Sequence, residues 1–493
     1  MIQRIIKSSR RIGPQFVRTF CSVHEEEDPE VDELLDETFD ALLPSSLRPA
    51  IQTGLNLLIV QPKIKWGPEK TKLLSRTTPD LQIQENIALV ESLDDWTVED
   101  TLLLSTKSLL RKHIFGSGQL ESIKELTVKN NRITGVLMGI DLLPGYKQSD
   151  IQEMFHLPVF DRYSIVLQIF RQRARTKEAK LQVSLAELSY IKSRFRQSVD
   201  YSLESVAGVP LNIGHGDQPF HVRKEILKDR ETRLKKAIEK LRTKRQFLRS
   251  HRIKQKIPSV AIVGYTNSGK SSLIKALTRN PSIQAKDVLF HTLDIRVFEG
   301  RLDNIHQVLF IDTIGFIADI PTALIEAFKA TLEEVTLADL VIHVSDVSHP
   351  DVKNQRTTVL ETLKDIDIGR KLSTTMIEVG NKIDKMVTEG GKDLGPRVDL
   401  LVSATEGINL NVLRKEIEDR LFMSLGCFFK TFKVSNGGLE YQWLIRNAFV
   451  SSVEVDPEED NNLIIKTRMT EAAAGKFRKQ FPTFYTASNE INI

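Results

Sequence analysis

Cysteine is almost absent from this sequence, with only Cys21 and Cys427 among 493 residues. So few thiols exclude a disulfide framework and are typical of proteins from a reducing compartment. Long apolar runs are absent too, since none approaches the ~20 residues needed to cross a bilayer, so we expect no membrane insertion. The chain is too long for a single hydrophobic core, so its length favours roughly three domains.

Acidic residues are missing from the leader that precedes Glu25, whereas basic residues are frequent there: Arg4, Lys7, Arg10, Arg11 and Arg18. This composition, interleaved with apolar residues and serine, is typical of a mitochondrial transit peptide. The stretch RTFCS also resembles a matrix-protease cleavage site after Phe20. We therefore predict a transit peptide over residues 1–20 and a location in the mitochondrial matrix, with a disordered basic tail as the alternative.

The charge reverses after the leader, in EEEDPEVDELLDE, which predicts a disordered acidic linker over residues 21–50. Residues 51–160 then alternate strand-like runs with amphipathic segments, which predicts a small α/β domain with a parallel sheet. The expected strands are 56–60 and 133–140, and the expected helices are 85–93, 118–126 and 149–155. The Gly116-Ser117-Gly118 turn is interpreted as a tight turn, with an anion site at a helix start as the alternative.

Residues 161–256 have the pattern of two long amphipathic helices joined by a break that contains glycine, which predicts a helical hairpin. The second helix is strongly basic. Residues 223–256 hold fifteen Lys or Arg against four Asp or Glu, a net charge of +11. Pairing within the helix cannot neutralise this excess, so we predict a polyanionic partner, RNA above all, over an ordinary solvated face.

Five short buried-strand patterns follow, at 259–264, 308–313, 339–346, 374–381 and 399–404. Their alternation with helical patterns predicts a doubly wound α/β sheet over residues 257–425. The last segment, 426–493, shows one helix pattern and one strand pattern and is expected to form a small α+β domain.

The stretch GYTNSGKS (264–271) follows a strand, opens a helix and matches the phosphate-loop pattern of nucleoside-triphosphate-binding proteins. Its backbone N–H groups would surround phosphate oxygens, Lys270 would reach the β- and γ-phosphates, and the Ser271 hydroxyl would bind Mg²⁺. The predicted nucleotide-binding residues here are Gly264, Asn267, Ser268, Gly269, Lys270, Ser271 and Ser272. The Asn267 side-chain oxygen could also help to bind K⁺.

A second motif, Asp312-Thr313-Ile314-Gly315, ends the next strongly apolar strand. The aspartate is expected to hold the Mg²⁺ shell, and the Gly315 N–H to contact the γ-phosphate. Phe316 stands where many GTPases carry a glutamine that orients water. Because phenylalanine cannot do this chemistry, we expect slow intrinsic turnover and a partner that orders the site.

The base is indicated by Asn381-Lys382-Ile383-Asp384, which again follows a strand. The Asp384 carboxylate can accept hydrogen bonds from N1–H and the exocyclic amine of guanine, a pair that adenine does not offer. Asn381 would serve the O6/N7 edge and Lys382 the ring face. Ser403 and Ala404 would complete the pocket, so the predicted nucleotides are GTP and GDP.

Taken together, these stretches resemble the HflX-type GTPases, including mitochondrial members of the family. The resemblance rests on FDRYSIVLQIFRQRARTKEAKLQVSLAELSY, GYTNSGKSSL, LFHTLDIR, DTIGFIADIPTALIEAFKATLEE, NKID and VSATEGINL. It implies an N-terminal α/β domain with a helical hairpin, a central GTPase domain and a small C-terminal domain. It also implies Thr292 as the switch threonine that senses the γ-phosphate and joins Mg²⁺, so the expected catalytic residues are Lys270, Thr292 and Gly315.

The resemblance further implies binding to the large ribosomal subunit, with a role in separating ribosomal subunits or in late assembly. The basic helix would then lie against ribosomal RNA. Two departures affect this implication: the hairpin tip reads LNIGHGDQPF instead of a glycine-rich loop, and the segment after Thr292 reads IRVFEGR where the family tends to have a proline and two threonines. A GTPase switch on a protein partner and a GTPase that supports RNA modification remain as alternatives. We expect a monomer.

Overall fold

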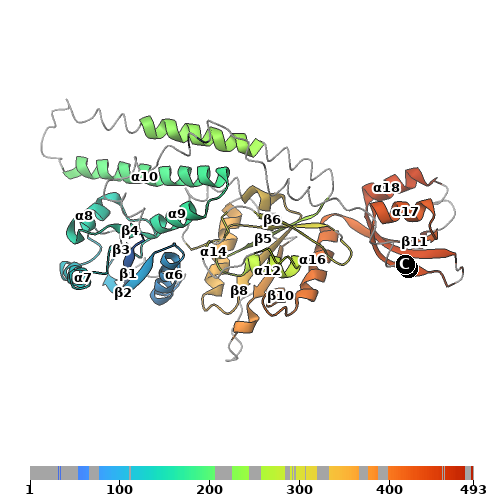
Figure 1. Cartoon of the computed structure of the whole chain (residues 1–493), viewed down its shortest axis with the longest axis horizontal. Coiled ribbons are helices and arrows are strands. Elements are labelled where there is room, and N and C mark those ends of the chain that lie inside the picture. Colours follow the sequence, from blue (N-terminus) through green and yellow to red (C-terminus); the bar gives the residue numbers. More distant parts are fainter. Residues whose placement is uncertain are drawn as a thin grey trace.

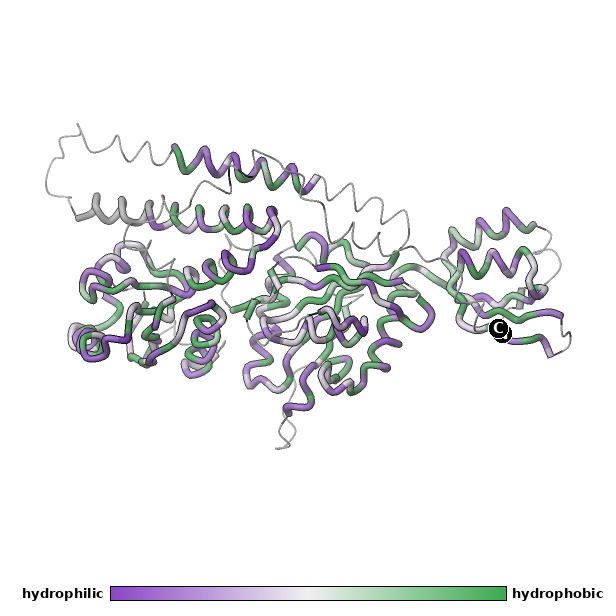
Figure 2. The backbone as a smooth tube through the Cα atoms, in the orientation of Figure 1, coloured by the Kyte–Doolittle hydropathy of each residue, from purple (hydrophilic) through white to green (hydrophobic). Residues whose placement is uncertain are grey.

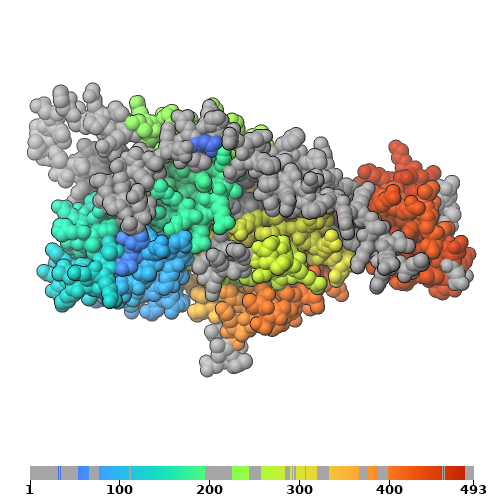
Figure 3. Space-filling view, viewed as in Figure 1, coloured from blue at the N-terminus to red at the C-terminus, as the bar shows by residue number. Residues whose placement is uncertain are grey.

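In the computed structural model, the described residues are 32, 34, 54–65, 77–109, 111, 113–205, 225–243, 257–283, 289, 290, 292, 293, 296–305, 307–318, 332–365, 376–386, 398–457, 459, 461–482, 490 and 491. They form three units in a row, with the C-terminal unit on the far side of the central unit from the N-terminal one (Figures 1 and 3). The transit-peptide prediction, the hairpin tip and residues 244–256 lie outside the described residues. No described helix is both long and apolar enough to cross a bilayer.

The N-terminal unit is a four-stranded parallel sheet in the order β2-β1-β3-β4, covered by helices. Its elements are β1 (Asn56–Ile64), α6 (Pro79–Glu91), β2 (Thr97–Thr106), α7 (Ser117–Lys129), β3 (Gly135–Met138), α8 (Gly145–Phe155) and β4 (Val159–Asp161). The sequence patterns identified β1, β3 and the three helices but missed the three-residue strand β4 and the longer strand β2. That strand lies at the sheet edge and is mostly half-exposed, so it lacks the continuous apolar run of a central parallel strand.

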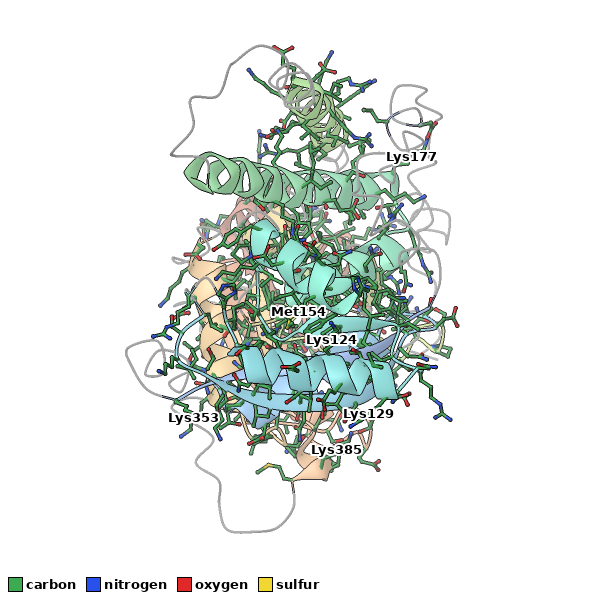
Figure 4. The ribbon with its side chains drawn as sticks, turned by 90° about the vertical axis from the view of Figure 1, so that its left-hand side faces the viewer. Lys124, Lys129, Met154, Lys177, Lys353 and Lys385 are labelled. Carbon is green, nitrogen blue, oxygen red and sulfur yellow. The ribbon has the colours of Figure 1, made fainter. Side chains whose placement is uncertain are left out.

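The predicted helical hairpin packs over this unit. Helix α9 (Arg162–Arg173) leads into α10 (Lys177–Ser205), and a further helix occupies residues 225–243. We call residues 225–243 the outer helix, because α10 lies between it and the N-terminal sheet (Figures 1 and 4). The two long helices share a buried seam of apolar side chains, with Leu181, Leu188, Leu227, Leu234 and Ala237 at its centre.

A buried aspartate fastens the hairpin to the sheet. Asp161 is fully buried at the end of β4 and caps α9 by accepting the Ser164 N–H at 2.8 Å. Two side chains of α10 bind the same carboxylate: the Tyr190 hydroxyl at 3.0 Å and the Arg194 guanidinium at 2.9 Å. These hydrogen bonds offset the free-energy cost of burying the Asp161 carboxylate, and they hold α10 in a fixed position on the sheet.

The acidic segment 21–50 was predicted to be a disordered linker, and that prediction is wrong at the two positions the structure describes. Leu34 is only 5% exposed and packs on the apolar seam of the hairpin. The Asp32 carboxylate lies 2.7 Å from Lys177 Nζ at the start of α10. The hairpin leaves apolar surface that Leu34 covers, a tertiary contact that local charge cannot reveal.

The central unit contains a six-stranded sheet in the order β10-β9-β8-β5-β7-β6, in which only the β6–β7 pairing is antiparallel. Its elements are β5 (Ser259–Gly264), α12 (Lys270–Thr278), β6 (Arg296–Gly300), β7 (Val308–Asp312), β8 (Leu340–Asp346), α14 (Val352–Asp365), β9 (Met376–Asn381), the 3-10 turn η3 (Ile383–Lys385), β10 (Leu400–Leu401) and α16 (Leu410–Ser424). The apolar strands lie at the centre of the unit and polar residues at its periphery (Figure 2). The predicted doubly wound sheet is therefore confirmed, with β6 as an unpredicted edge strand.

One apolar core crosses from the N-terminal unit into the central unit. It includes Leu89 and Phe170 on one side and Phe290, Phe316 and Val341 on the other. Phe170 and Phe290 meet edge to face, with ring centroids 4.8 Å apart. Because a shared core resists sliding, the two units form a single packed body.

The C-terminal unit is an antiparallel sheet in the order β12-β13-β11-β14 with two helices on one face. Its elements are β11 (Cys427–Ser435), α17 (Leu439–Asn447), β12 (Phe449–Val455), β13 (Asn462–Thr470), α18 (Glu471–Gln480) and β14 (Glu490–Ile491). Arg468 joins it to the central unit, because its guanidinium lies over the ring of Phe422 in α16 and binds Asp419 at 2.9 Å, while it also lies over the ring of Phe429 in β11. The antiparallel sheet with its two helices agrees with the predicted α+β class.

Candidate nucleotide-binding site

The predicted motifs meet at one edge of the central sheet. Strands β5, β7 and β9 run parallel and end at Gly264, Asp312 and Asn381, the first residue of each motif. Parallel strands present their carboxyl ends at a common edge, which is where ligands bind in doubly wound folds. The sheet topology therefore brings together stretches that are more than one hundred residues apart.

The phosphate loop has a backbone that only certain residues can adopt. A Cβ on Gly264 would lie 2.3 Å from the Val344 carbonyl oxygen, so this position requires glycine. Gly269 has a φ of +92°, and a Cβ there would lie 2.2 Å from Asn381 Nδ2. Asn267 also has a positive φ, of 60°, which asparagine tolerates better than most residues, and its side chain is exposed. Ser268 lies in the loop and is buried, whereas Ser272 lies in the first turn of α12 and is half-buried.

Lys270 opens α12 and is buried at the centre of the loop. Its ammonium donates hydrogen bonds to the carbonyl oxygens of Gly264 at 3.1 Å and Tyr265 at 2.8 Å. Burial lowers the pKa of Lys270 to about 8; the negative charge of Asp312 opposes this effect, and Lys382 adds to it. Two neutral carbonyl contacts do not neutralise a buried positive charge. The Lys270 ammonium can therefore still attract an anion, such as a phosphate group.

The three residues predicted to bind metal lie within hydrogen-bond distance of one another. The Ser271 hydroxyl donates to Asp312 Oδ2 at 2.7 Å, the Thr292 hydroxyl donates to the same oxygen at 3.0 Å, and the two hydroxyl oxygens are 3.3 Å apart. Burial raises the pKa of Asp312, although these hydroxyls and Lys270 oppose the increase. Among the described residues nothing hydrogen-bonds the buried Asp312 Oδ1. Hydroxyl and carboxylate oxygens are the donors that Mg²⁺ prefers, so the set fits that ion.

The segment after Asp312 lies against the phosphate loop. The Thr266 N–H donates to the Phe316 carbonyl at 2.7 Å, and the Phe316 N–H donates to the Gly264 carbonyl at 3.2 Å. Gly315 fits between them, since a Cβ there would lie 2.8 Å from Thr266 Cγ2 and 3.2 Å from Lys270 Nζ. The Phe316 ring is 3% exposed and belongs to the core shared with the N-terminal unit, so this residue acts here by packing.

The base-recognition residues lie on the opposite side of the phosphate loop from this segment. Asn381 is buried, donating to the Ser268 carbonyl at 3.0 Å and accepting the Ala404 N–H at 3.1 Å, so it ties the two loops together. Its predicted contact with the purine edge stays a prediction. Asp384 Oδ1 accepts the Ser403 hydroxyl at 2.5 Å, and Lys382 pairs with Asp346 at 2.8 Å.

Sequence patterns missed the residues that reach the site from the N-terminal unit. The Leu289 N–H, three residues before Thr292, donates to Ser92 Oγ at 3.1 Å. The Tyr265 hydroxyl, inside the phosphate-loop pattern, donates to Glu85 of α6. Tyr265 occupies a position that the pattern leaves free, and nothing near Glu85 in the sequence marks it, so no local signal could have found this pair.

Models of known families match three consecutive parts of the chain. One described as GTP-binding GTPase N-terminal matches residues 80–171, one described as GTP-binding GTPase Middle Region matches residues 173–252, and one described as 50S ribosome-binding GTPase matches residues 259–382. Together they cover the N-terminal unit, the hairpin and most of the central unit.

Curated relatives extend over most of the chain. A Xenopus laevis protein named GTP-binding protein 6 is 39% identical over 452 residues, which span 92% of this chain and 84% of that protein. GTPase HflX of Magnetococcus marinus is 33% identical over 410 residues, 81% of this chain and 92% of that protein. A solved structure of a GTP-binding protein from Sulfolobus solfataricus with GDP is 23% identical, covers 75% of this chain and 99% of that one, and has a TM-score of 0.39. The chain therefore belongs to the HflX family of GTPases.

Proposed function

We propose that this protein is a mitochondrial GTPase that associates with the large ribosomal subunit and acts in ribosomal subunit dissociation and recycling or in late assembly of that subunit. GTP binding would hold the bound conformation, and hydrolysis would release it. The observation that carries the proposal is the outer helix, the described part of the basic stretch 223–256, which itself holds seven Lys or Arg against four Asp or Glu. It lies on the outside of the molecule (Figure 1), and Arg242 joins it by an ion pair to Glu333, in a segment that follows the switch residues.

At the nucleotide, we assign Lys270 to the β- and γ-phosphates and the Gly315 N–H to the γ-phosphate. The mutually bonded oxygens of Ser271, Thr292 and Asp312 support a Mg²⁺ site, and the ion would neutralise charge that develops on the transferred phosphoryl group. Glycines at 264 and 269 let the backbone approach the phosphates. Asp384, with Ser403 and Ala404 beside it, would select guanine, and Asn267 remains our candidate for a K⁺ ligand.

The outer helix supports the RNA contact through its geometry. Its apolar residues Leu227 and Leu234 are buried on α10, so most of its basic residues point away from the core, although Arg230 is buried. Lys228, Lys235 and Lys236 are exposed, with Lys235 paired to Glu231 at 2.6 Å, and ammonium groups on an outer surface suit the phosphates of RNA. Contacts of this kind give affinity and orientation without requiring a particular base sequence.

An ion pair offers a path from the outer helix to the nucleotide. The Arg242 guanidinium binds both carboxylate oxygens of Glu333, with Nε at 3.1 Å from Oε2. Glu333 lies in the segment 332–337, which packs into the shared core through Leu332 and Val335. A bidentate arginine pair fixes both distance and orientation, so RNA bound to this helix could act on the GTPase unit.

The experiment is to measure GTP hydrolysis by the chain that lacks residues 1–20, alone and with purified mitochondrial large subunits, together with gradient sedimentation of intact ribosomes. Stimulation with conversion of whole ribosomes into subunits would establish recycling, and stimulation without splitting would favour assembly. Absence of both stimulation and co-sedimentation would contradict the ribosomal proposal and favour a protein partner.

A matched pair of double variants tests the surface. Changing Lys228 and Lys236 to Ala should weaken large-subunit binding about tenfold and reduce the slope of log affinity against log salt by about 2. Lys124 and Lys129 of α7 are also exposed, on the opposite side of α10 from the outer helix (Figure 4). Their double alanine variant should bind as the wild type does. Equal losses in both variants would show that charge alone, and not this helix, governs binding.

A further inference from the structure

Tyr265 is buried at the junction of the phosphate loop, the segment after Asp312 and the N-terminal unit. Its side chain is 7% exposed, and its backbone carbonyl accepts the Lys270 ammonium at 2.8 Å. Its hydroxyl oxygen accepts the Ala318 N–H at 2.7 Å while the hydroxyl proton is donated to Glu85. One side chain therefore contacts the loop that holds phosphate, the segment that contains Gly315 and a helix of another unit.

Glu85 is held in place by the N-terminal unit. Arg162, which is 7% exposed at the start of α9, donates to the second Glu85 oxygen at 3.0 Å and to Asp141 at 3.2 Å. Burial and the negative charge of Glu85 raise the pKa of Tyr265 well above its ordinary value, so the phenol keeps its proton and donates it. The carboxylate is thus a fixed acceptor, and the phenol is oriented toward it.

The partner on the other side of the hydroxyl belongs to the segment that must be placed accurately for hydrolysis. Ala318 follows Gly315 by three residues, and the intervening Phe316 forms a backbone bridge with the phosphate loop. The side chains of Ile314, Phe316 and Ile317 lie in the shared core beside Tyr265. Core packing holds this segment laterally, and the Tyr265 hydroxyl supplies a directed bond at its far end.

We propose that Tyr265 is a positioning residue for GTP hydrolysis, through which Glu85 of the N-terminal unit fixes the phosphate loop and the Gly315-containing segment relative to each other. The N-terminal unit would then set the hydrolysis rate of the GTPase unit directly, without contact between any of its residues and the nucleotide. This inference goes beyond the ribosomal proposal and does not depend on it, because the bonds all lie within the chain.

The test is the substitution Tyr265→Phe in the full chain, which removes one oxygen and keeps the ring in the core. We expect kcat for GTP to fall on the order of tenfold, the value of a hydrogen bond to a charged group, while KM changes by less than about threefold. The rate should suffer more than binding, because Lys270 keeps its bond to the Tyr265 backbone carbonyl, whereas the Gly315 segment loses its tie.

Tyr163→Phe provides the matched control. Tyr163 is buried in the same core, at 4% exposure, and its hydroxyl has no hydrogen-bond partner among the described residues. Loss of that oxygen should leave kcat unchanged. A fall of the same size in both variants would overturn the proposal, since it would show that any buried tyrosine in this core affects the rate through general stability.

Glu85→Gln gives an independent variant if Tyr265→Phe folds poorly. Glutamine can still accept from the phenol but loses its ion pair with Arg162, so kcat should fall by a smaller factor than in Tyr265→Phe. In the double variant the two effects should not multiply, because both act through one bond. Multiplicative effects, or an unchanged kcat in Tyr265→Phe with folding intact by circular dichroism, would also overturn it. All these assays are run without ribosomes, so failure of the ribosomal proposal would leave their outcome unaffected.

Discussion

The N-terminal and central sheets have the same kind of topology but differ at the edge where ligands bind. In the first, β1 lies between β2 and β3, and in the second, β5 lies between β7 and β8. All these neighbours are parallel, so the chain turns in opposite directions on the two sides of β1 and of β5. Doubly wound folds bind ligands outside the carboxyl ends of strands at such a point.

The groups at the carboxyl ends of the strands differ between the two sheets. Beyond β5, glycines bring backbone close together around the buried ammonium of Lys270. At β1, a neutral amide network takes the space: Gln61 donates to Gln82 at 2.8 Å and accepts from Asn86 at 2.8 Å. Gly139 makes room there for a side chain of the protein itself, because a Cβ would lie 1.9 Å from Gln61 Oε1. Topology thus offers two candidate edges, and the residues at the strand ends decide which one can bind an anion.

Removing the buried cation of the central edge should have the largest effect. Lys270→Ala should reduce kcat/KM for GTP by 100-fold or more, because no other described ammonium lies inside the loop to replace it. Hydrolysis assays and titration with a fluorescent guanine nucleotide would measure this loss.

Lys147→Met is the matched change at the other edge. Lys147 is also buried, at 4% exposure, beside the N-terminal sheet, where its ammonium donates to the Leu109 carbonyl at 2.9 Å. Its loss should leave GTP affinity within about twofold of the wild type. A comparable loss in both variants would break the comparison, since it would place a nucleotide contact at each sheet.

Filling the space at the carboxyl ends of the N-terminal sheet's strands should have the next largest effect. Gly139→Ala drives a Cβ into Gln61, so at least one of the two amide hydrogen bonds must break. We expect the free energy of unfolding to fall by about 1–3 kcal/mol, measured by urea denaturation, with GTP affinity of the folded protein unchanged. Gly118→Ala is the control, since a Cβ there meets nothing within 4 Å and alanine favours the helix. Weakened GTP binding in Gly139→Ala would indicate that the edge is functional.

The smallest expected effect concerns the pH dependence of stability. The free energy of unfolding should depend on acid pH through the central sheet but not through the amide network of the N-terminal sheet. Glu378 in β9 makes two 2.6 Å hydrogen bonds with Arg356. Burial acts to raise the pKa of Glu378, but interactions with His343 and Arg356 outweigh it and bring the pKa to about 2, below the ordinary 4.5. The carboxylate therefore stabilises the fold above about pH 4.5, and this contribution is lost as the pH falls toward 2.

Glu378→Gln should accordingly lower the free energy of unfolding by about 1–2 kcal/mol at pH 7, and the difference from the wild type should shrink below pH 4.5. The cost of Gly139→Ala should stay constant over the same range, because amides do not titrate. Urea denaturation of both variants at several pH values would measure this contrast. A pH-independent cost for Glu378→Gln would show that the ion pair contributes through packing alone.

Much of the fold was predictable from the sequence because its central strands are fully buried and read as apolar runs. Strands β1, β5, β7 and β8 were found for that reason. The edge strands β2 and β6 and most of the C-terminal sheet were missed, since their half-exposed residues alternate weakly. The buried position of Leu34 was also unpredictable, because it depends on a seam formed by helices more than 140 residues away.

What the sequence by itself determined is the chemistry of the site. A glycine-rich loop, an aspartate at a strand end and the NKID stretch are local patterns, and each keeps its meaning wherever the chain places it. Only the tertiary structure decided what surrounds them: the pairing of Ser271 and Thr292 on Asp312, the burial of Phe316, and the contact of Tyr265 with Glu85. These depend on packing between residues far apart in the chain, and a spacing pattern records only neighbours along it.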